Sequence, residues 1–411
     1  MKTIGKKLNK AKWLLLFCFA FSWQVQAQKK VVAYLPNWVN YNLFASTINY
    51  EKLTHINIAF ENPDAAGNLS FSPANTTLIQ QAHAKEVKVL VSIGGGAATS
   101  NLHSIYFNLI SDAQRAGFVG KIAAYLTAHN LDGIDVDLEG SAINQDYGKF
   151  IEALSTALKP QGKLVTAALS HVNGGDAVTA STFQYFDFIN IMAYDETGPW
   201  APARPGQHAS MAFAKASVDN WLGRGLPKEK AVLGVPFYGY GFGADFNQGM
   251  GFAEIIQRFP GSENQDEAGS TIYYNGIPTI RAKAEYVVEE QLGGIMIWQL
   301  AQDATGNFSL LNTIHQVFAT VTGVAENGTD VGIYIYPNPA KLANVGYLVF
   351  PESTEKVKIT ITDLKGGKIF DKSFKNKQRQ ARMELPKLGQ GMYIIQVKAD
   401  KREYSNKYLI E

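Results

Sequence analysis

Residues 131–140 read LDGIDVDLEG, a stretch in which acidic and apolar side chains alternate. Because successive side chains of a β-strand point to opposite faces, Asp135, Asp137 and Glu139 share one face and the apolar residues between them share the other. In a barrel of parallel strands, the apolar set would face the surrounding helices and the carboxyls would face inward. At a rise of about 3.3 Å per residue, Glu139 lies roughly 13 Å beyond Asp135, at the mouth where barrel enzymes place their active sites.

Seven further runs of β-branched and aromatic residues flank this stretch at wide intervals, with helical patterns between them. Eight such runs in one segment predict an α/β fold, the (β/α)8 TIM barrel. A doubly wound open sheet would need a glycine-rich phosphate turn after its first strand, and residues 36–38, PNW, supply none. The predicted strands are Val31–Leu35, Leu53–Phe60, Val87–Ile93, Leu131–Leu138, Leu164–Leu169, Phe186–Tyr194, Ala231–Tyr238 and Gly294–Leu300, and the predicted helices include Ala113–Leu126, Gln145–Leu158, Ala212–Leu222 and Thr279–Gln291.

Beyond residue 322 the pattern changes to short segments that alternate with a period of two. Residues 323–332 are polar and contain glycine, which indicates a linker. We therefore predict a barrel domain over residues 28–322 and a small all-β sandwich over residues 333–411. The predicted strands of the sandwich are Tyr347–Phe350, Lys356–Asp363, Lys368–Phe374, Gln380–Leu385 and Gly391–Ala399.

The first 27 residues carry five lysines, no acidic residue and an apolar run from Trp13 to Phe21. With small residues at the end of VQA, residues 25–27, this pattern predicts a secretory signal peptide over residues 1–27. The apolar run is about half of the roughly 20 residues that span a bilayer, so we expect an exported chain without a transmembrane segment. The only cysteine, Cys18, lies within the run, and the mature chain is expected to form no disulfide.

Charge is distributed unevenly, although the whole chain has a net charge of +2. Residues 28–330 carry 18 basic and 28 acidic residues, whereas residues 331–411 carry 15 basic and 8 acidic residues. An acidic barrel segment does not attract a phosphate backbone, so no nucleic acid is expected as a partner. The seven histidines form no metal-binding motif, and His55 on an apolar strand is expected to be a core residue. We therefore predict no metal and no cofactor.

Three carboxyls stacked on one inward face cannot all stay ionised in an interior that holds little water. At least one of them should hold a proton near neutral pH. A carboxyl with a raised pKa and a neighbour that can share its proton is what a general acid requires. The alternatives are salt-bridge partners or a calcium site, but calcium loops are glycine-containing loops and do not lie on an apolar strand.

This stretch resembles the catalytic signature of the family 18 glycoside hydrolases, D-G-x-D-x-D-x-E at the end of the fourth barrel strand. Asp132, Gly133, Asp135, Asp137 and Glu139 fill every fixed position. Four shorter segments resemble further motifs of this family and occur in the same order along residues 31–303. They are SIGG at residues 92–95 on the third strand, MAYD at 192–195 on the sixth, GVPFYG at 234–239 on the seventh and GGIMIW at 293–298 on the eighth.

The resemblance implies a secreted chitinase that hydrolyses the β-1,4 bonds of N-acetylglucosamine polymers with retention of configuration. The substrate's own acetamido group would be the nucleophile and would form an oxazolinium intermediate. By this resemblance, Glu139 is the acid and base, Asp137 orients the acetamido N–H, and Asp135 is the buried partner of Asp137.

The resemblance also implies residues that bind the sugar around these acids. Tyr194 would donate its hydroxyl to the acetamido oxygen, Met192 and Asp195 would shape the pocket, and Trp298 would form the floor beneath the cleaved sugar. Pyranose rings pack on aromatic faces, and further aromatic residues lie where the predicted strands end. For the two tyrosines and the phenylalanine among them, packing inside the barrel is the alternative. These further candidates are Trp38, Trp200, Tyr34, Phe60 and Tyr238.

The spacing of the last two barrel motifs bears on the shape of the cleft. Only 53 residues separate Gly239 from Gly293, too few for the α+β insertion that deepens the groove in many exo-acting members, so we expect an open cleft. Endo-β-N-acetylglucosaminidases that act on N-glycans share much of the motif and remain an alternative, although Gly140 favours chitin-type substrates. A chitin-binding lectin on the same barrel is a second alternative, but lectins of that kind usually lack one of the acids that are present here.

The C-terminal segment resembles the sorting domain of the type IX secretion system. The residues that carry this resemblance are YPNP at 336–339, GMYI at 391–394 and SNK at 405–407. It implies passage through the periplasm, recognition by the type IX machinery and a secreted or cell-surface location. A carbohydrate-binding sandwich is the alternative, but the segment is rich in lysine and arginine and contains no tryptophan.

Overall fold

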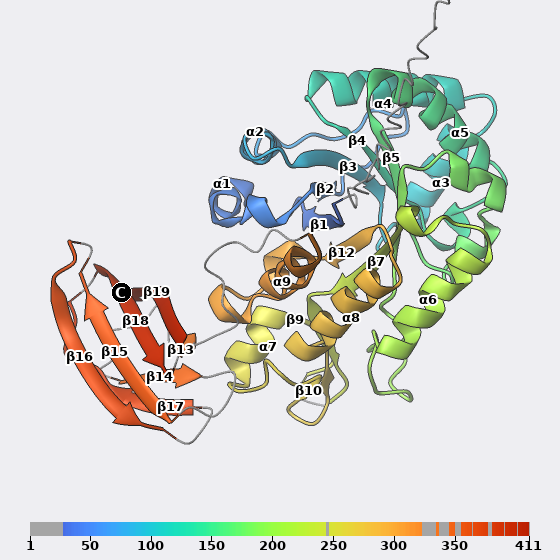
Figure 1. Cartoon of the computed structure of the whole chain (residues 1–411). Helices are drawn as coiled ribbons and strands as arrows, with labels where there is room; N and C mark the ends of the chain where they lie inside the picture. The colour runs from blue at the N-terminus through green and yellow to red at the C-terminus, as the bar shows by residue number, and fades with distance from the viewer. Residues whose placement is uncertain are drawn as a thin grey trace, which may run out of the picture.

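A computed structural model describes the chain over two long ranges and several shorter ones near the C-terminus (Figure 1). The predicted signal peptide and the predicted linker lie outside the described residues. The described ranges are 28–243, 246–322, 334–336, 345–349, 355–363, 365–376, 380–389, 391–400 and 402–410.

Eight parallel strands close into a barrel, which confirms the predicted fold class (Figure 1). Around the barrel the strand order is β1-β12-β7-β6-β5-β4-β3-β2. Each predicted run contributes one of these strands. Their bounds are β1 (Lys30–Pro36), β2 (His55–Ala59), β3 (Lys88–Gly94), β4 (Gly133–Asp137), β5 (Leu164–Leu169), β6 (Phe188–Ile191), β7 (Ala231–Pro236) and β12 (Gly294–Trp298).

Helices connect successive strands and surround the barrel, as parallel strands require. Each of the four predicted helices is present, with ends shifted by at most two residues. The helices are α1 (Tyr41–Phe44), α2 (Asn75–His83), α3 (Ser100–Leu109), α4 (Arg115–Ala128), α5 (Tyr147–Leu158), α6 (Met211–Gly223), α7 (Phe252–Arg258), α8 (Ile277–Glu289) and α9 (Leu310–Thr322).

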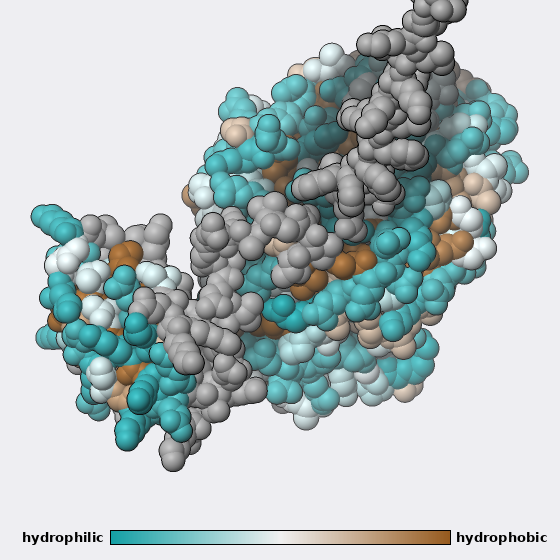
Figure 2. All heavy atoms as spheres, viewed as in Figure 1, coloured by the Kyte–Doolittle hydropathy of each residue, from teal (hydrophilic) through white to brown (hydrophobic). Residues whose placement is uncertain are grey.

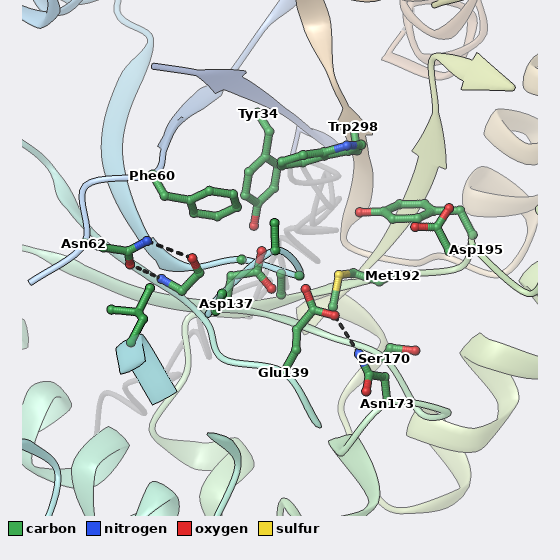
Figure 3. Close-up of a pocket in the computed structure, with 18 of the residues that line it drawn as sticks. Tyr34, Phe60, Asn62, Asp137, Glu139, Ser170, Asn173, Met192, Asp195 and Trp298 are labelled. Carbon is green, nitrogen blue, oxygen red and sulfur yellow. Dashed lines mark hydrogen bonds between the residues drawn. The ribbon is translucent and has the colours of Figure 1, made fainter. Parts of the chain in front are cut away.

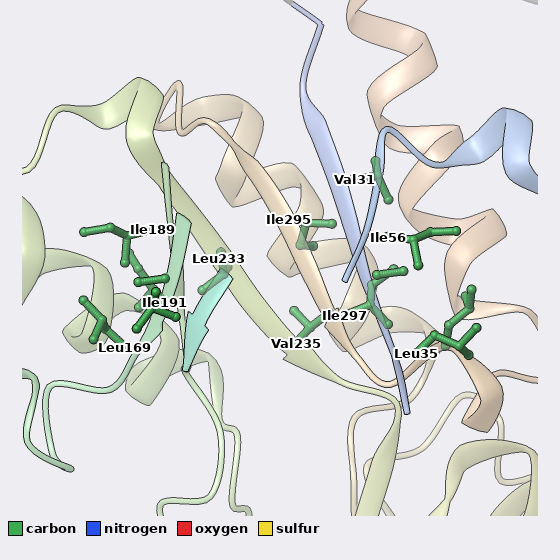
Figure 4. Packing of buried hydrophobic residues seen from close by; sticks show 14 of the residues in the cluster. Val31, Leu35, Ile56, Leu169, Ile189, Ile191, Leu233, Val235, Ile295 and Ile297 are labelled. Atoms are coloured by element: carbon green, nitrogen blue, oxygen red, sulfur yellow. The ribbon is translucent and has the colours of Figure 1, made fainter. Parts of the chain in front are cut away.

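The core of the barrel domain has two layers, one on each face of the sheet. The outward side chains of the strands pack against the helices in one large apolar cluster, to which Ile134, Val136 and Leu138 belong, as the alternation predicts. Figure 4 shows part of this layer, including Ile191, Leu233 and Ile295. Inward side chains form a second, smaller cluster inside the barrel, which leaves room there for polar groups. On the face seen in Figure 2, hydrophilic residues cover most of the described surface of this domain.

Five of the predicted barrel strands are longer than the strands in the structure, among them those that correspond to β4 and β6. β4 ends at Asp137, and Glu139 follows it in an extended conformation with φ −125° and ψ 157°. The side-chain alternation therefore continues to Glu139 beyond the last hydrogen-bonded strand residue. β6 ends at Ile191, so the motif at 192–195 lies in the segment that follows the strand. Both motifs thus reach the carboxyl-end mouth of the barrel, where strand pairing no longer constrains the backbone.

Between β7 and α8 the structure contains a small antiparallel sheet that the sequence did not predict. Four short strands pair in the order β10-β11-β8-β9, and α7 follows β9. Strands this short carry too few residues for periodicity to identify them. Their bounds are β8 (Tyr238–Gly241), β9 (Gly249–Gly251), β10 (Glu267–Ala268) and β11 (Ile272–Tyr273).

The C-terminal part forms two antiparallel sheets that share one apolar core, as predicted for a sandwich (Figure 1). Leu348, Ile359 and Tyr408, from both sheets, belong to that core. The first and last strands were missed by the sequence analysis. One sheet contains β13 (Tyr334–Tyr336), β14 (Val345–Val349) and β17 (Gln380–Glu384), and the other contains β16 (Lys368–Lys375), β15 (Lys356–Thr362), β18 (Gly391–Ala399) and β19 (Arg402–Ile410). Within the described ranges, the longest apolar helices fall short of what a membrane span requires.

Candidate active site

A cleft with a volume of about 690 Å³ lies at the carboxyl ends of the barrel strands (Figure 3). Residues that follow or end β1, β2, β3, β4, β5, β6 and β12 line it. Gly94 at the end of β3 must be glycine, because its φ is +105° and a Cβ there would lie 2.1 Å from the carbonyl oxygen of Asp137. This close approach brings the segment after β3 against the end of β4 and sets one wall of the cleft.

Asp135 lies deepest and is fully enclosed by hydrogen-bond donors. Burial raises the pKa of Asp135 above its ordinary value, and the hydrogen bonds that it accepts oppose part of this rise. Four neutral donors converge on its two oxygens, which is an arrangement that stabilises an ionised carboxylate. The donors are Tyr34 Oη (2.6 Å) and Ser92 Oγ (2.8 Å) to Oδ2, and Thr166 Oγ1 (2.6 Å) and Asn190 Nδ2 (3.2 Å) to Oδ1.

Asp137, two residues further along β4, has a different environment. Its side chain is 4% exposed, and its Oδ1 is buried without a hydrogen-bond partner among the described residues. Burial, followed by the charges of Glu139 and Asp135, raises the pKa of Asp137 well above its ordinary value. The shift favours the protonated form, which can donate or accept one hydrogen bond toward the cleft.

Glu139 is the outermost of the three acids and faces the cleft. Its Oε2 accepts a hydrogen bond of 2.8 Å from Nδ2 of Asn173, in the segment after β5. Burial raises the pKa of Glu139, the bond from Asn173 lowers it, and the charge of Asp195 raises it. The net direction is upward, as a general acid that works near neutral pH requires.

The segment after β6 supplies three more side chains to the cleft: Met192, Tyr194 and Asp195. Burial and the nearby carboxyl charges raise the pKa of Tyr194 well above its ordinary value, so its hydroxyl remains a donor. Asp195 lies in the left-handed region with φ 65°. The hydroxyl of Tyr238 donates to Asp195 Oδ1, and His208 Nδ1 lies 3.4 Å from the same oxygen. Asp195 is therefore held from behind by two buried rings.

Aromatic rings form the floor of the cleft. The ring of Trp298 lies 5.8 Å from that of Phe60, nearly parallel to it, and 5.5 Å from that of Tyr34. Figure 3 shows the three rings on the side of the cleft opposite Glu139. The peptide bonds Ala59–Phe60 and Trp298–Gln299 are cis. Tyr34 serves both the floor and the carboxylate network, because its hydroxyl donates to Asp135.

Two indoles stand at the rim of the cleft. Trp38 is 68% exposed and Trp200 is 59% exposed, and both line the cleft. Trp200 packs edge-on against Tyr240 of the small antiparallel sheet, with ring centres 5.1 Å apart. Exposed indoles held in place beside a cleft can offer flat apolar faces to a ligand.

The structure brings all but two of the predicted site residues to the cleft. Asp135 is fully buried beneath it, and Tyr238 lies behind Asp195. Sequence reasoning missed the residues that hold the acids in place. The parallel register places Ser92 and Thr166 directly beside Asp135, a signal that becomes readable only once the strands are paired. Asn173 lies in a loop, where no periodic signal exists.

Another missed residue, Asn62, fixes the backbone of the segment after β3. Its Oδ1 accepts from the amide of Gly94 at 2.7 Å, and its Nδ2 donates to the carbonyl of Gly94 at 3.0 Å (Figure 3). The hydroxyl of Tyr106 also donates to Asn62 Oδ1. Within the part of the chain that the structure describes, no group of three or more histidine, cysteine, aspartate or glutamate side chains could hold a metal ion.

Comparison with known proteins agrees with this geometry. Residues 30–303 match the family model described as glycosyl hydrolases family 18. The chain belongs to this family. The crystal structure of the GH18 chitinase ChiB from the chitin utilization locus of Flavobacterium johnsoniae is 40% identical, with a TM-score of 0.68, and the match covers 73% of this chain and 98% of that one. A chitinase structure from Bacteroides thetaiotaomicron is 28% identical, with a TM-score of 0.65, over 74% of this chain and all of that one.

A curated relative, a probable chitinase 10 of Drosophila melanogaster, is 27% identical over 304 residues. That match covers 58% of this chain but 13% of the relative, so this chain spans a small part of the length of that protein. The barrel of the family 18 protein is thus a chitinase-like glycoside hydrolase domain. Residues 334–411 match the secretion system C-terminal sorting domain, which confirms the predicted identity of the C-terminal part and implies export.

Proposed function

We propose that this family 18 protein is a chitinase that cleaves the β-1,4 bonds of N-acetylglucosamine polymers with retention of configuration. The observation that carries the proposal is how the environments of three successive acids differ along β4 and the segment that follows it. Asp135 is a carboxyl enclosed by four donors, Asp137 is a buried carboxyl whose pKa is raised well above its ordinary value, and Glu139 is an acid that faces the cleft. Chitinases among the similar structures support the choice of polymer.

The state of Asp137 bears on the identity of the nucleophile. A retaining mechanism needs a nucleophile on the face of the sugar opposite the acid. Asp137 is buried and its raised pKa favours the protonated form, which is a poor nucleophile. We therefore propose that the carbonyl oxygen of the substrate's 2-acetamido group attacks the anomeric carbon. The unpartnered Oδ1 of Asp137 would accept the acetamido N–H and hold that group in line.

The reaction then proceeds in two steps. In the first, Glu139 gives its proton to the glycosidic oxygen, the bond from that oxygen to the anomeric carbon breaks, and the acetamido oxygen bonds to that carbon to give an oxazolinium ion. In the second, water attacks the same carbon, the bond from that carbon to the acetamido oxygen breaks, and the water gives a proton back to Glu139, which restores the acid. The positive charge that develops lies beside the Asp137–Asp135 pair, and the hydroxyl of Tyr194 would hold the acetamido oxygen.

The aromatic residues fit a polymer as the ligand. Trp298 would support the sugar at the cleaved bond, and Trp38 and Trp200 at the rim would support sugars further along the chain. The residues of the small antiparallel sheet do not line the cleft, so a chain could enter it from the side and leave at both ends. We therefore propose cleavage within the polymer.

Mass spectrometry of products would test this assignment. The full chain is incubated with an N-acetylglucosamine hexamer and, in parallel, with a high-mannose glycoprotein. Dimers and trimers from the hexamer, with the glycoprotein unchanged, are the expected result. Release of glycan from the glycoprotein alone would instead assign the protein to the endo-β-N-acetylglucosaminidases. Binding of the hexamer without cleavage would identify a lectin.

We also propose the route of export. Residues 1–27 would direct the chain to the periplasm, and the sorting domain would direct it through the type IX machinery to the medium or the cell surface. The match of residues 334–411 supports this route. Deletion of those residues in a host with type IX secretion should leave the enzyme in the periplasm, whereas the full chain with Glu139→Gln should be exported normally. Export of the truncated chain at the normal level would contradict the proposal.

A further inference from the structure

We propose that Asn173 is a positioning residue for the acid: its amide holds Oε2 of Glu139, so that Oε1 carries the proton delivered to the substrate. The inference rests on the proposed function of Glu139 as the acid. The hydrogen bond from Asn173 Nδ2 to Glu139 Oε2 is 2.8 Å long (Figure 3). An oxygen that accepts an N–H bond is a poorer site for the proton than its free partner.

The loop that carries Asn173 has a fixed backbone. The amides of Asn173 and Gly175 both donate to the carbonyl of Ser170, at 3.4 and 3.0 Å. Arg224, which follows the last residue of α6, donates to the carbonyl of Gly175 at 3.2 Å. The loop is therefore anchored at its base, and Asn173 projects from a tight turn. A side chain on such a turn loses little further freedom when it binds Glu139.

Two glycines join this loop to the end of β4. Gly174 packs so closely on Gly140 that a Cβ at position 174 would lie 2.5 Å from the carbonyl oxygen of Gly140. The amide of Gly140 also donates to the carbonyl of Asn173 at 3.2 Å. Both glycines have positive φ, 85° and 55°, which favours glycine at each position. Gly140, which follows Glu139, is thus hydrogen-bonded to the backbone of Asn173, the residue whose side chain holds Glu139.

The other oxygen of Glu139 faces open space beside Gly96. A Cβ at position 96 would lie 2.9 Å from Oε1 and 3.6 Å from Oε2, so Oε1 is the oxygen on that side. The segment after β3 presents glycine and alanine there, at residues 94–98. Oε1 therefore has room for a substrate oxygen, whereas Oε2 is covered by the amide of Asn173.

The charges around Glu139 explain why such a donor is needed. Asp137 on β4 and Asp195 on the segment after β6 are acidic, and Tyr194 faces the same acids with its hydroxyl protonated. His171, on the same loop as Asn173, packs on Phe213 and does not line the cleft. Among the described residues that line the cleft, none is lysine, arginine or histidine. The Asn173 amide therefore stabilises the ionised acid after it has lost its proton.

Titration of Glu139 with and without this amide tests the inference. The full chain is labelled with 13C at the glutamate carboxyls, and the spectrum of Glu139→Gln identifies the signal of Glu139. Asn173→Ala should raise the pKa of Glu139 by about one unit, because a hydrogen bond to a charged group is lost. Asn173→Asp, which keeps the size and shape of the side chain, should raise the pKa further because it adds a negative charge. Asp176→Asn is the control, since Asp176 lies on the same loop but outside the cleft.

The rate of hexamer cleavage provides the second readout. The basic limb of the kcat profile should move upward with the pKa of Glu139, and kcat should fall while KM changes little. An unchanged Glu139 titration in both Asn173 variants, or an equal shift in Asp176→Asn, would overturn the inference. If the Asn173 variants shift the pKa of Glu139 but the wild-type chain cleaves no oligosaccharide, the role of Asn173 is supported and the proposed function is overturned.

Discussion

The deep part of β4 and the extended segment that follows it show how one stretch of chain makes two kinds of carboxyl. At Asp135 four donors from four other segments converge on the two oxygens and enclose the carboxyl. At Glu139 one amide occupies one oxygen, and the other faces the cleft. Asp137 lies between them with an unpartnered oxygen and a raised pKa. The number of hydrogen-bond donors around each carboxyl, and not whether it belongs to aspartate or glutamate, separates the structural role of Asp135 from the proposed catalytic role of Glu139.

Removal of the outer acid should have the largest effect on activity. Glu139→Gln keeps the hydrogen bond from Asn173 within reach but cannot deliver a proton, so kcat on the hexamer should fall by about 10²- to 10⁴-fold. Glu152→Gln on α5 makes the same change outside the cleft, where the carboxyl pairs with Tyr185, and should leave kcat unchanged. Full activity of Glu139→Gln would show that another group supplies the proton.

Removal of the deep acid should mainly affect stability. Asp135→Ala leaves four buried donors without their acceptor, and we expect a loss of about 3–5 kcal/mol in the free energy of unfolding. Asp64 also accepts several hydrogen bonds, from Asn68 and Ala66, but it does so at the surface. Urea unfolding of Asp64→Ala should therefore show a much smaller loss. Similar losses of unfolding free energy in Asp135→Ala and Asp64→Ala would mean that the enclosure of Asp135 adds nothing to stability.

The open side of Glu139 can be closed by one methyl group. Gly96→Ala places a Cβ 2.9 Å from Oε1, so the carboxyl must move. A displaced acid should lower kcat about tenfold, with little change in stability. Gly117→Ala on α4 is the matched control, because nothing lies within 4 Å of its new methyl group. Equal kcat values for the two variants would show that the space beside Oε1 is not used.

Asp137→Asn should change how stability depends on pH. The folded-state pKa of Asp137 is raised above its ordinary value of 3.8, so folding retains a proton that the unfolded chain releases. The free energy of unfolding should therefore fall as the pH rises above that value, by about 1.4 kcal/mol for each unit of the shift. Unfolding curves at pH 4 and pH 8 should show that Asp137→Asn is relatively more stable at pH 8. If the difference in unfolding free energy between Asp137→Asn and the wild type did not change with pH, another group would hold the proton.

Much of the barrel could be predicted because its signals are local. Alternation in residues 131–140 assigned Ile134 and Val136 to the helix side and the three acids to the interior, and the structure agrees. The donors around Asp135 could not be predicted, since their meeting depends on the register of neighbouring strands. Tyr238 was expected in the cleft, because it ends a barrel motif, yet the turn into β8 carries it behind Asp195.

The small antiparallel sheet and Asn173 escaped prediction for related reasons. Strands of two to four residues, such as β10 and β8, contain one or two repeats of the two-residue strand period, too few to be identified. Asn173 gains its role from the contact between Gly174 and Gly140, which are far apart in the sequence. A lone asparagine in a loop carries no signal of such a contact.

The protonation states of Asp135 and Asp137 test the central claim most directly. The full chain is labelled with 13C at the aspartate carboxyls, and Asp135→Asn and Asp137→Asn identify the two signals. At pH 7 we expect the signal of Asp135 at the position of an ionised carboxylate and that of Asp137 at the position of a neutral acid. Two ionised signals, or a neutral Asp135 beside an ionised Asp137, would contradict the account.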